Sequence, residues 1–165
     1  MQPRLQYALS GVVALRAAAA FACGGNPQAR MLAGAGVVLG TADGGRRWSM
    51  QALPAFSYAA ADGTAVSGSA AEGTLPMLNA IAAAGTVLWA VGDYGLVVTA
   101  PVSAANSTPP VWTVVTVLGA GAPAAAALYG IAWDGLRAGY VYGNGVIYST
   151  RDSGASWQLN QIPPP

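Results

Sequence analysis

An octapeptide that occurs twice limits the fold of this chain more than any other feature of its sequence. The two copies, Thr41–Trp48 and Thr150–Trp157, share the frame Thr-x-Asp-x-Gly-x-x-Trp. The five residues before each copy are also similar, because Gly36-Val-Val-Leu-Gly precedes the first copy and Gly145-Val-Ile-Tyr-Ser precedes the second. A motif that recurs together with its context predicts an architecture of repeated units.

Three units can be laid out around this motif, at about residues 5–58, 75–118 and 126–162 of one repeat domain over residues 1–165. Each unit reads as four short strands, because β-branched and aromatic residues alternate between glycine-rich turns. The third strand follows a glycine and the fourth begins at a tryptophan. These markers are Gly36, Gly95 and Gly145, and Trp48, Trp112 and Trp157. The glycines are 59 and 50 residues apart (95 − 36 and 145 − 95), close to the length of a propeller blade.

The segments between the units predict connections rather than further elements. Residues 59–74 are small and polar and are interpreted as a flexible connection. Pro101–Pro110 replaces the octapeptide in the middle unit. The short alanine runs are too brief and too close to glycine and proline to form helices.

The first 25 residues have three interpretations. A transmembrane helix is opposed by Arg16 in the middle of the apolar run and by the weak apolarity of alanine. A secretory signal fits Arg4 and the small residues that follow the apolar stretch. Strands fit because Leu9–Val13 and Ala20–Gly24 match the first two strands of the other units. We favour strands and expect no transmembrane span, with a signal as the alternative.

Composition excludes several kinds of chemistry within this chain. There is no histidine and a single cysteine, so an internal disulfide, a zinc site with histidine, and a Ser-His or Cys-His catalytic pair are all ruled out. A net charge of +1 gives no electrostatic basis for binding nucleic acid. Only 8% of residues are charged, against about 25% in typical proteins, so the surface is either made of Ala, Gly, Ser, Thr, Gln and Asn or partly buried against something else. We predict no cofactor and no metal.

The octapeptide frame is that of the Asp-box, also called the bacterial neuraminidase repeat. The aspartates can accept hydrogen bonds from the backbone of their own turn, and the glycines permit a left-handed conformation. The threonines supply a second side-chain hydrogen bond, and the tryptophans are expected to bury their rings between sheets. The predicted structural residues are Thr41, Asp43, Gly45 and Trp48, and Thr150, Asp152, Gly154 and Trp157. One carboxylate per motif argues against a metal site, so function is to be sought away from these aspartates.

The wider unit resembles the photosystem II stability and assembly factor family, although Asp-boxes also occur in sialidases, xyloglucan-degrading glycosidases and sortilin-like receptors. The resemblance implies a β-propeller, with a repeat architecture like that of WD40 and YVTN proteins. It also implies a location outside the cytoplasm or in an organelle lumen. Propellers close with 4–8 blades, so about three blades make an incomplete ring or a fragment whose open faces invite a partner.

Two functions follow from these features. The first is a non-catalytic module for protein binding or complex assembly, with a protein partner or self-association and no catalytic residue. The candidate charged contacts are Arg16, Arg30, Arg46, Arg47, Arg137 and Arg151, and the candidate aromatic contacts are Tyr94, Tyr140 and Tyr142.

The alternative is a fragment or remnant of an Asp-box glycosidase of the sialidase or xyloglucanase type. Glycoside hydrolysis needs two carboxylates at a suitable separation. Asp93 and Asp134 are the only plausible pair, because the other acids lie in the octapeptides or in the flexible connection (Asp62 and Glu72). Each of the two sits beside glycine in a predicted turn, which favours a structural role.

Overall fold

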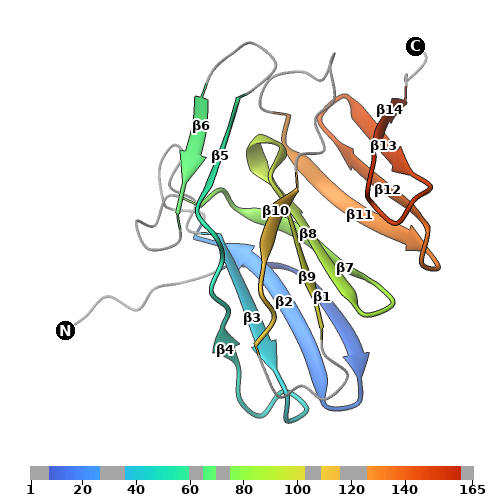
Figure 1. Cartoon of the computed structure of the whole chain (residues 1–165). Helices are drawn as coiled ribbons and strands as arrows, with labels where there is room; N and C mark the ends of the chain where they lie inside the picture. Colours follow the sequence, from blue (N-terminus) through green and yellow to red (C-terminus); the bar gives the residue numbers. More distant parts are fainter. Residues whose placement is uncertain are drawn as a thin grey trace.

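The computed structural model describes residues 8–26, 36–59, 65–69, 75–102, 109–115 and 126–160. In these segments the protein is almost entirely β-structure, with three four-stranded sheets and one two-stranded sheet, all antiparallel (Figure 1). The helical structure among them is one turn of 3-10 helix, η1 (Asp93–Gly95). The predicted all-β fold of about three four-stranded blades is therefore confirmed.

Each four-stranded sheet is a meander in chain order, and we number the sheets as blades 1 to 3. Blade 1 contains β1 (Ala8–Arg16), β2 (Ala19–Gly25), β3 (Val37–Thr41) and β4 (Ser49–Met50). Blade 2 contains β7 (Leu78–Ala84), β8 (Val87–Gly92), β9 (Val97–Pro101) and β10 (Thr113–Val115). Blade 3 contains β11 (Leu128–Asp134), β12 (Ala138–Gly143), β13 (Val146–Thr150) and β14 (Gln158–Asn160). The two-stranded sheet pairs β5 (Phe56–Ala59) with β6 (Ala65–Gly68).

The N-terminal segment forms the first two strands of blade 1. β1 and β2 pair from Ala8↔Gly25 to Arg16↔Ala19, and β2 pairs in turn with β3. The strand interpretation is thus confirmed for residues 8–25. Within the described segments, no helix is long and apolar enough to cross a membrane.

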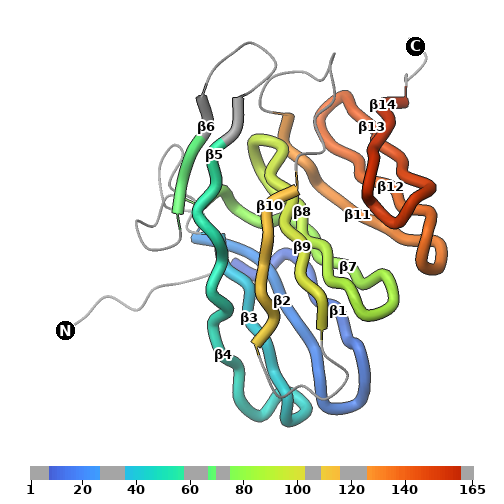
Figure 2. Tube along the Cα trace, viewed as in Figure 1, coloured from blue at the N-terminus to red at the C-terminus, as the bar shows by residue number. Residues whose placement is uncertain are grey.

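The first strands of the three blades, β1, β7 and β11, lie side by side, and the last strands form the outer edges (Figure 2). One apolar cluster fills the space between blades 1 and 2, with Phe21, Leu78 and Trp112 among its members. A second fills the space between blades 2 and 3, with Trp89, Val141 and Tyr148 among its members. Both faces of blade 2 are therefore covered. Burial of apolar side chains between sheets is the main stabilising term in such a stack.

The connection after blade 1 differs from its prediction. Residues 65–68 form β6 and pair with β5, so the predicted flexible connection over residues 59–74 is wrong there. Phe56 at the start of β5 is buried in the first cluster and anchors this hairpin to the blades. Small polar composition alone does not reveal such a pairing, since it is made by backbone hydrogen bonds. Residues 60–64 and 70–74 lie outside the described part.

The two ends of each blade differ. At one end lie the hairpin turns that join the first strand to the second and the turns that join the third strand to the fourth. They meet there because Thr41, the last residue of β3, pairs with Ala20 near the start of β2, and Thr150 pairs with Gly139 in the same way. We call this the turn end. The opposite end carries η1 and the Asn144–Gly145 turn.

Candidate functional site at the turn end of the blades

The first octapeptide forms a turn that is closed by its own side chains. The Thr41 hydroxyl donates to Asp43 Oδ1 at 2.9 Å and accepts the Gly45 N–H at 3.0 Å. Asp43 Oδ1 also accepts the Arg47 N–H at 2.9 Å. Gly45 has φ +87, a conformation that glycine adopts without steric cost. The hydrogen bond from the Arg47 amide is the main cause that lowers the pKa of Asp43.

The second octapeptide forms the same turn with one further hydrogen bond. The Thr150 hydroxyl donates to Asp152 Oδ1 at 2.7 Å and accepts the Gly154 N–H at 3.0 Å. Ser156 donates twice to the Asp152 carboxylate, from its backbone N–H at 2.9 Å and from its hydroxyl at 2.5 Å. The hydroxyl of Ser156 is the largest of the causes that lower the pKa of Asp152 to about 2. Both carboxylates are therefore engaged inside their own turns and remain charged at neutral pH.

Each turn is also tied to the neighbouring hairpin of its own blade. Gly44 donates its N–H to the Ala18 carbonyl at 3.0 Å in blade 1, and Ser153 donates to the Arg137 carbonyl at 3.0 Å in blade 3. The middle blade keeps this tie without an octapeptide, because the Val102 N–H donates to the Thr86 carbonyl at 2.7 Å. At the turn end of each blade, a backbone hydrogen bond thus joins the segment after the third strand to the hairpin between the first two strands.

The two octapeptide tryptophans have different surroundings. Trp157 is half-buried and packs edge-on against Trp89 and Trp133, with ring centroids 5.9 and 5.8 Å away. Trp48 is exposed, so the expectation that it is buried between sheets is wrong. The tryptophan at this position is covered only where another blade precedes its own. Blade 2 precedes blade 3 and covers Trp157, whereas no blade precedes blade 1 among the described residues, so Trp48 stays exposed.

All described arginines lie at the turn end. Arg16 ends β1, Arg46 and Arg47 lie in the first octapeptide turn, Arg137 lies in the β11–β12 turn, and Arg151 lies in the second octapeptide turn. All five are exposed. The described acids at this end are Asp43, Asp134 and Asp152, so its formal charge is +2 (5 − 3). Arg30 lies outside the described residues.

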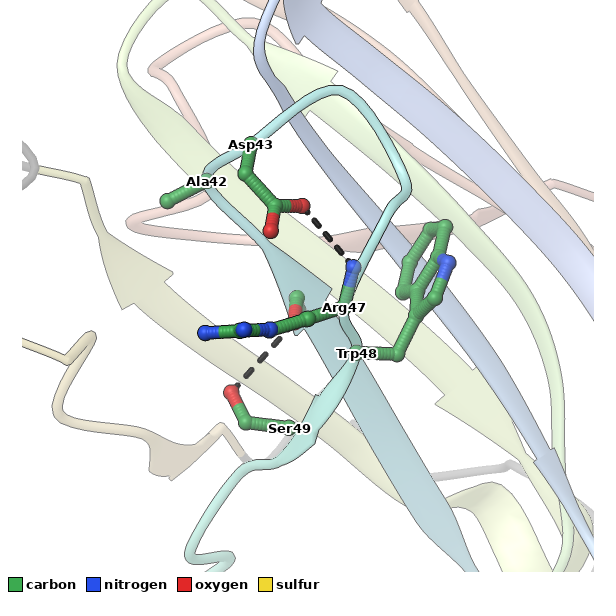
Figure 3. Close-up of a pocket in the computed structure, with 6 residues that line it drawn as sticks. Ala42, Asp43, Arg47, Trp48 and Ser49 are labelled. Atoms are coloured by element: carbon green, nitrogen blue, oxygen red, sulfur yellow. Dashed lines mark hydrogen bonds between the residues drawn. The ribbon is translucent and has the colours of Figure 1, made fainter.

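A shallow groove of about 430 Å³ opens beside the first octapeptide turn. Gly40, Ala42, Asp43, Arg47, Trp48 and Ser49 line it. Figure 3 shows the Arg47 side chain extending across the groove between Asp43 and Ser49, while the Trp48 ring turns to the other side. The Ser49 hydroxyl donates to the Gly40 carbonyl at 3.3 Å. The guanidinium of Arg47 at this rim suits an acidic side chain from a partner.

The predicted carboxylate pair of a glycosidase is not brought together. Asn79 Nδ2 donates to both Asp93 Oδ1 and the Leu128 carbonyl, each at 2.9 Å, so Asp93 lies beside the first residue of β11. Asp134 is the last residue of that strand. Six residue steps of about 3.3 Å separate the ends of β11 by about 20 Å. Retaining and inverting glycosidases need a separation between about 5 and 9.5 Å.

The three candidate aromatic contacts differ in their exposure. Tyr140 and Tyr142 are exposed on β12, as a contact role requires. Tyr94 is half-buried in η1, packed against the cluster between blades 1 and 2. In the described segments, no three side chains of His, Cys, Asp or Glu are grouped to hold a metal ion.

Sequence reasoning missed two sets of residues that organise the site. One is the bridge of Asn79 between blades 2 and 3, for which a polar residue inside an apolar strand was the available signal. The other is the cluster of Trp89, Trp133 and Trp157, where the centroids of Trp89 and Trp133 lie 5.0 Å apart. Nothing in the linear pattern connects these three rings, which come from β8, from β11 and from the residue before β14.

The stack of four-stranded antiparallel meanders, with their first strands side by side, defines a β-propeller fold. The chain is similar to a solved structure of YCF48, a photosystem II assembly factor and β-propeller, bound to a D1 peptide. The TM-score is 0.64 and the identity 19%, over 96% of this chain and 41% of the YCF48 chain. This chain thus spans about two fifths of the length of the protein that it matches. No protein-family model and no curated protein sequence matches it.

Proposed function

We propose that this chain is a non-catalytic β-propeller module that binds a protein partner in complex assembly, as the assembly factors of photosystem II do. The observation that carries the proposal is the gathering of five exposed arginines at the turn end. Two of the three carboxylates there are taken up by their own turns, so the guanidinium groups of Arg46, Arg47, Arg137 and Arg151 can face a partner. The partner surface that fits is an acidic one, because opposite charges steer and orient a complex.

The two octapeptides are, in this proposal, Asp-boxes with a structural role. Their side chains close the turns, and backbone hydrogen bonds fasten the turns to the adjacent hairpins, so the octapeptides hold the arginines of both end blades in place. They supply no reacting group. The YCF48 structure supports a binding function of this kind, since YCF48 is bound to a D1 peptide in it.

The alternative of a glycosidase fragment has less support. Its only candidate pair, Asp93 and Asp134, is split between the two ends of β11. Release of sugar from aryl-glycosides or sialosides, abolished by Asp134→Asn, would reverse this ranking.

The test is affinity capture from an extract of the source, with two matched variants as bait. One variant replaces Arg46, Arg47, Arg137 and Arg151 by glutamine. This change keeps the backbone hydrogen bonds of the turns, because Arg47 and Arg137 make them through the N–H and the carbonyl. The other variant replaces Tyr140 and Tyr142 by serine and keeps every arginine. Circular dichroism and thermal unfolding check that both baits are folded.

The proposal predicts a protein recovered by the wild type and by the tyrosine variant and lost with the glutamine variant. Purified, that protein should bind more weakly as salt rises, because exposed charges are screened at about 10 Å in 0.1 M salt. Recovery of no protein, or equal recovery by all three baits with no dependence on salt, would contradict it.

A further inference from the structure

The turn end of blade 2 contains no charged residue, in contrast to the turn ends on either side of it. The sequence from Pro101 to Trp112 has no Asp, Glu, Lys or Arg, and neither has the Gly85–Thr86 turn. Among the described residues, blade 1 has three arginines and one aspartate at this end, a formal charge of +2 (3 − 1). Blade 3 has two of each, a formal charge of 0 (2 − 2). The positive charge of the turn end thus lies on blade 1, beside an uncharged blade 2.

Two large apolar side chains are exposed at this uncharged end. Val111 is 73% exposed, directly before the tryptophan of blade 2, at the position that Arg47 holds in blade 1. It lies at the turn end because β10 begins opposite the end of β9. Leu136 in the β11–β12 turn is 62% exposed and leans over blade 2, since a Cβ added to Gly85 would collide with its side chain. A backbone hydrogen bond joins the two turns of blade 2 between them, so both side chains belong to one surface.

The exposure of this surface does not depend on further blades. Blade 2 already has a blade on each side, and Val111 and the Gly85–Thr86 turn are exposed all the same. The β1–β2 turn is exposed although blade 2 follows it, so a blade that followed blade 3 would leave the turn of Leu136 open in the same way. The equivalents of Arg46 and Arg47 in blade 3 are exposed although blade 2 precedes them. The surface is therefore accessible in a longer propeller as well as in this stack.

The spacing of the blades sets the length of a partner segment that reaches both kinds of residue. Arg47 and Val111 hold equivalent positions in neighbouring blades, and packed sheets lie about 10 Å apart. An extended chain rises about 3.3 Å per residue, so three to four residues cover roughly 10–13 Å. An acidic side chain at the arginines of blade 1 and a large apolar side chain over blade 2 therefore stand about three to four residues apart in an extended segment.

We propose that the turn end binds an extended, acidic segment of a partner protein that also carries a large apolar side chain. The acids lie at the arginines of the first octapeptide turn, and the apolar side chain lies between Val111 and Leu136. This inference rests on the proposed function and adds an apolar requirement to the charged one. Exposed charge pairs steer the encounter and make it depend on salt, whereas a few buried anchors supply most of the binding energy.

The test is binding of labelled synthetic peptides, measured by fluorescence anisotropy. Each peptide carries two adjacent acids, then two serines, then either phenylalanine or a third serine, and each is made in both chain directions. The apolar variant of the protein is Val111→Ser with Leu136→Ser. Its matched control is Leu9→Ser with Tyr129→Ser, which removes two exposed apolar side chains at the opposite end of the blades. The charge variant replaces both arginines of the first octapeptide turn by glutamine, and thermal unfolding checks that all variants are folded.

In the wild type and the matched control, the phenylalanine peptide should have a Kd about fivefold or more below that of the serine peptide in at least one chain direction, as for an interface anchor. In the apolar variant the two peptides should bind equally, and the charge variant should bind both more weakly.

Three results overturn this inference alone. They are equal binding of the two peptides to the wild type, a preference for phenylalanine that the apolar variant keeps, and binding of neither peptide to the wild type. Unchanged binding by the charge variant overturns the arginine contact and this inference with it. The capture experiment with the glutamine bait decides the proposed function independently of the peptides.

Discussion

Replacing Gly154 by alanine tests whether the octapeptide turn of blade 3 is fitted against the preceding blade. Gly154 has φ +85 and lies under the Trp89 ring. Gly45 is its counterpart in blade 1, with φ +87 and the same hydrogen bond to a threonine hydroxyl at 3.0 Å. The two substitutions therefore share their backbone cost and differ in what the new methyl group meets.

The structure gives the size of each effect. A positive φ costs an L-residue about 1–2 kcal/mol of folding free energy, and this applies to both sites. At Gly154 the new Cβ would lie 2.3 and 2.6 Å from two atoms of Trp89, which is buried and packed against Trp133. Moving such a ring costs about 1–3 kcal/mol more, as overpacking of a core does. Gly154→Ala should thus destabilise by about 2–5 kcal/mol and Gly45→Ala by about 1–2 kcal/mol.

The assay is urea unfolding followed by tryptophan fluorescence. Fluorescence of the native state should change in Gly154→Ala, since the Trp89 ring must shift, and should stay unchanged in Gly45→Ala. Equal losses of stability at the two sites, or a larger loss at Gly45, would mean that the contact between blades 2 and 3 does not distinguish them.

Three further predictions concern single side chains. The pKa of Asp152 is lowered from 3.8 to about 2 on folding, so its contribution to stability is present above about pH 4 and is lost as the pH falls toward 2. As the pH falls over that range, the urea midpoint of unfolding should fall less in Asp152→Asn than in the wild type. The same dependence of the midpoint on pH in both proteins would count against the hydrogen bonds to Asp152. Burial raises the pKa of the Cys23 thiol to about 12, so a thiol reagent should modify it slowly in the native state and rapidly in urea. Fast labelling of the native protein at neutral pH would contradict its place in the core. Asn79→Ala removes both hydrogen bonds through which Asn79 joins Asp93 to Leu128. The free energy of unfolding measured in urea should therefore fall by about 1–3 kcal/mol. A loss near zero would mean that this bridge does not hold blades 2 and 3 together.

Much of the fold could be predicted from the sequence because the repeat carries its own local physics. Alternating β-branched residues favour strands wherever they stand, and the glycines that separate them mark the turns. This is why β1 and β2 could be aligned with the corresponding strands of blades 2 and 3, despite an alanine-rich run that otherwise suggests a signal. The hydrogen bonds within the octapeptides are equally local, since they join residues at most four apart.

The features that could not be predicted all depend on contacts between blades. Trp48 and Trp157 occupy the same position of one motif, yet their burial differs because only Trp157 has a neighbouring blade against it. The separation of Asp93 from Asp134 depends on how blade 2 sits beside blade 3, through Asn79. The hairpin of β5 and β6 is fixed by the burial of Phe56, which local composition does not encode.

Hydrogen exchange of the complex will show whether a protein partner is held at the arginine-bearing turn end. The protein recovered by affinity capture is purified and bound, and amide exchange is compared with that of the free chain. We predict slower exchange in the turns at residues 42–48, 135–137 and 151–156. Slower exchange confined to η1 and the Asn144–Gly145 turn, with no change at the turn end, would contradict it.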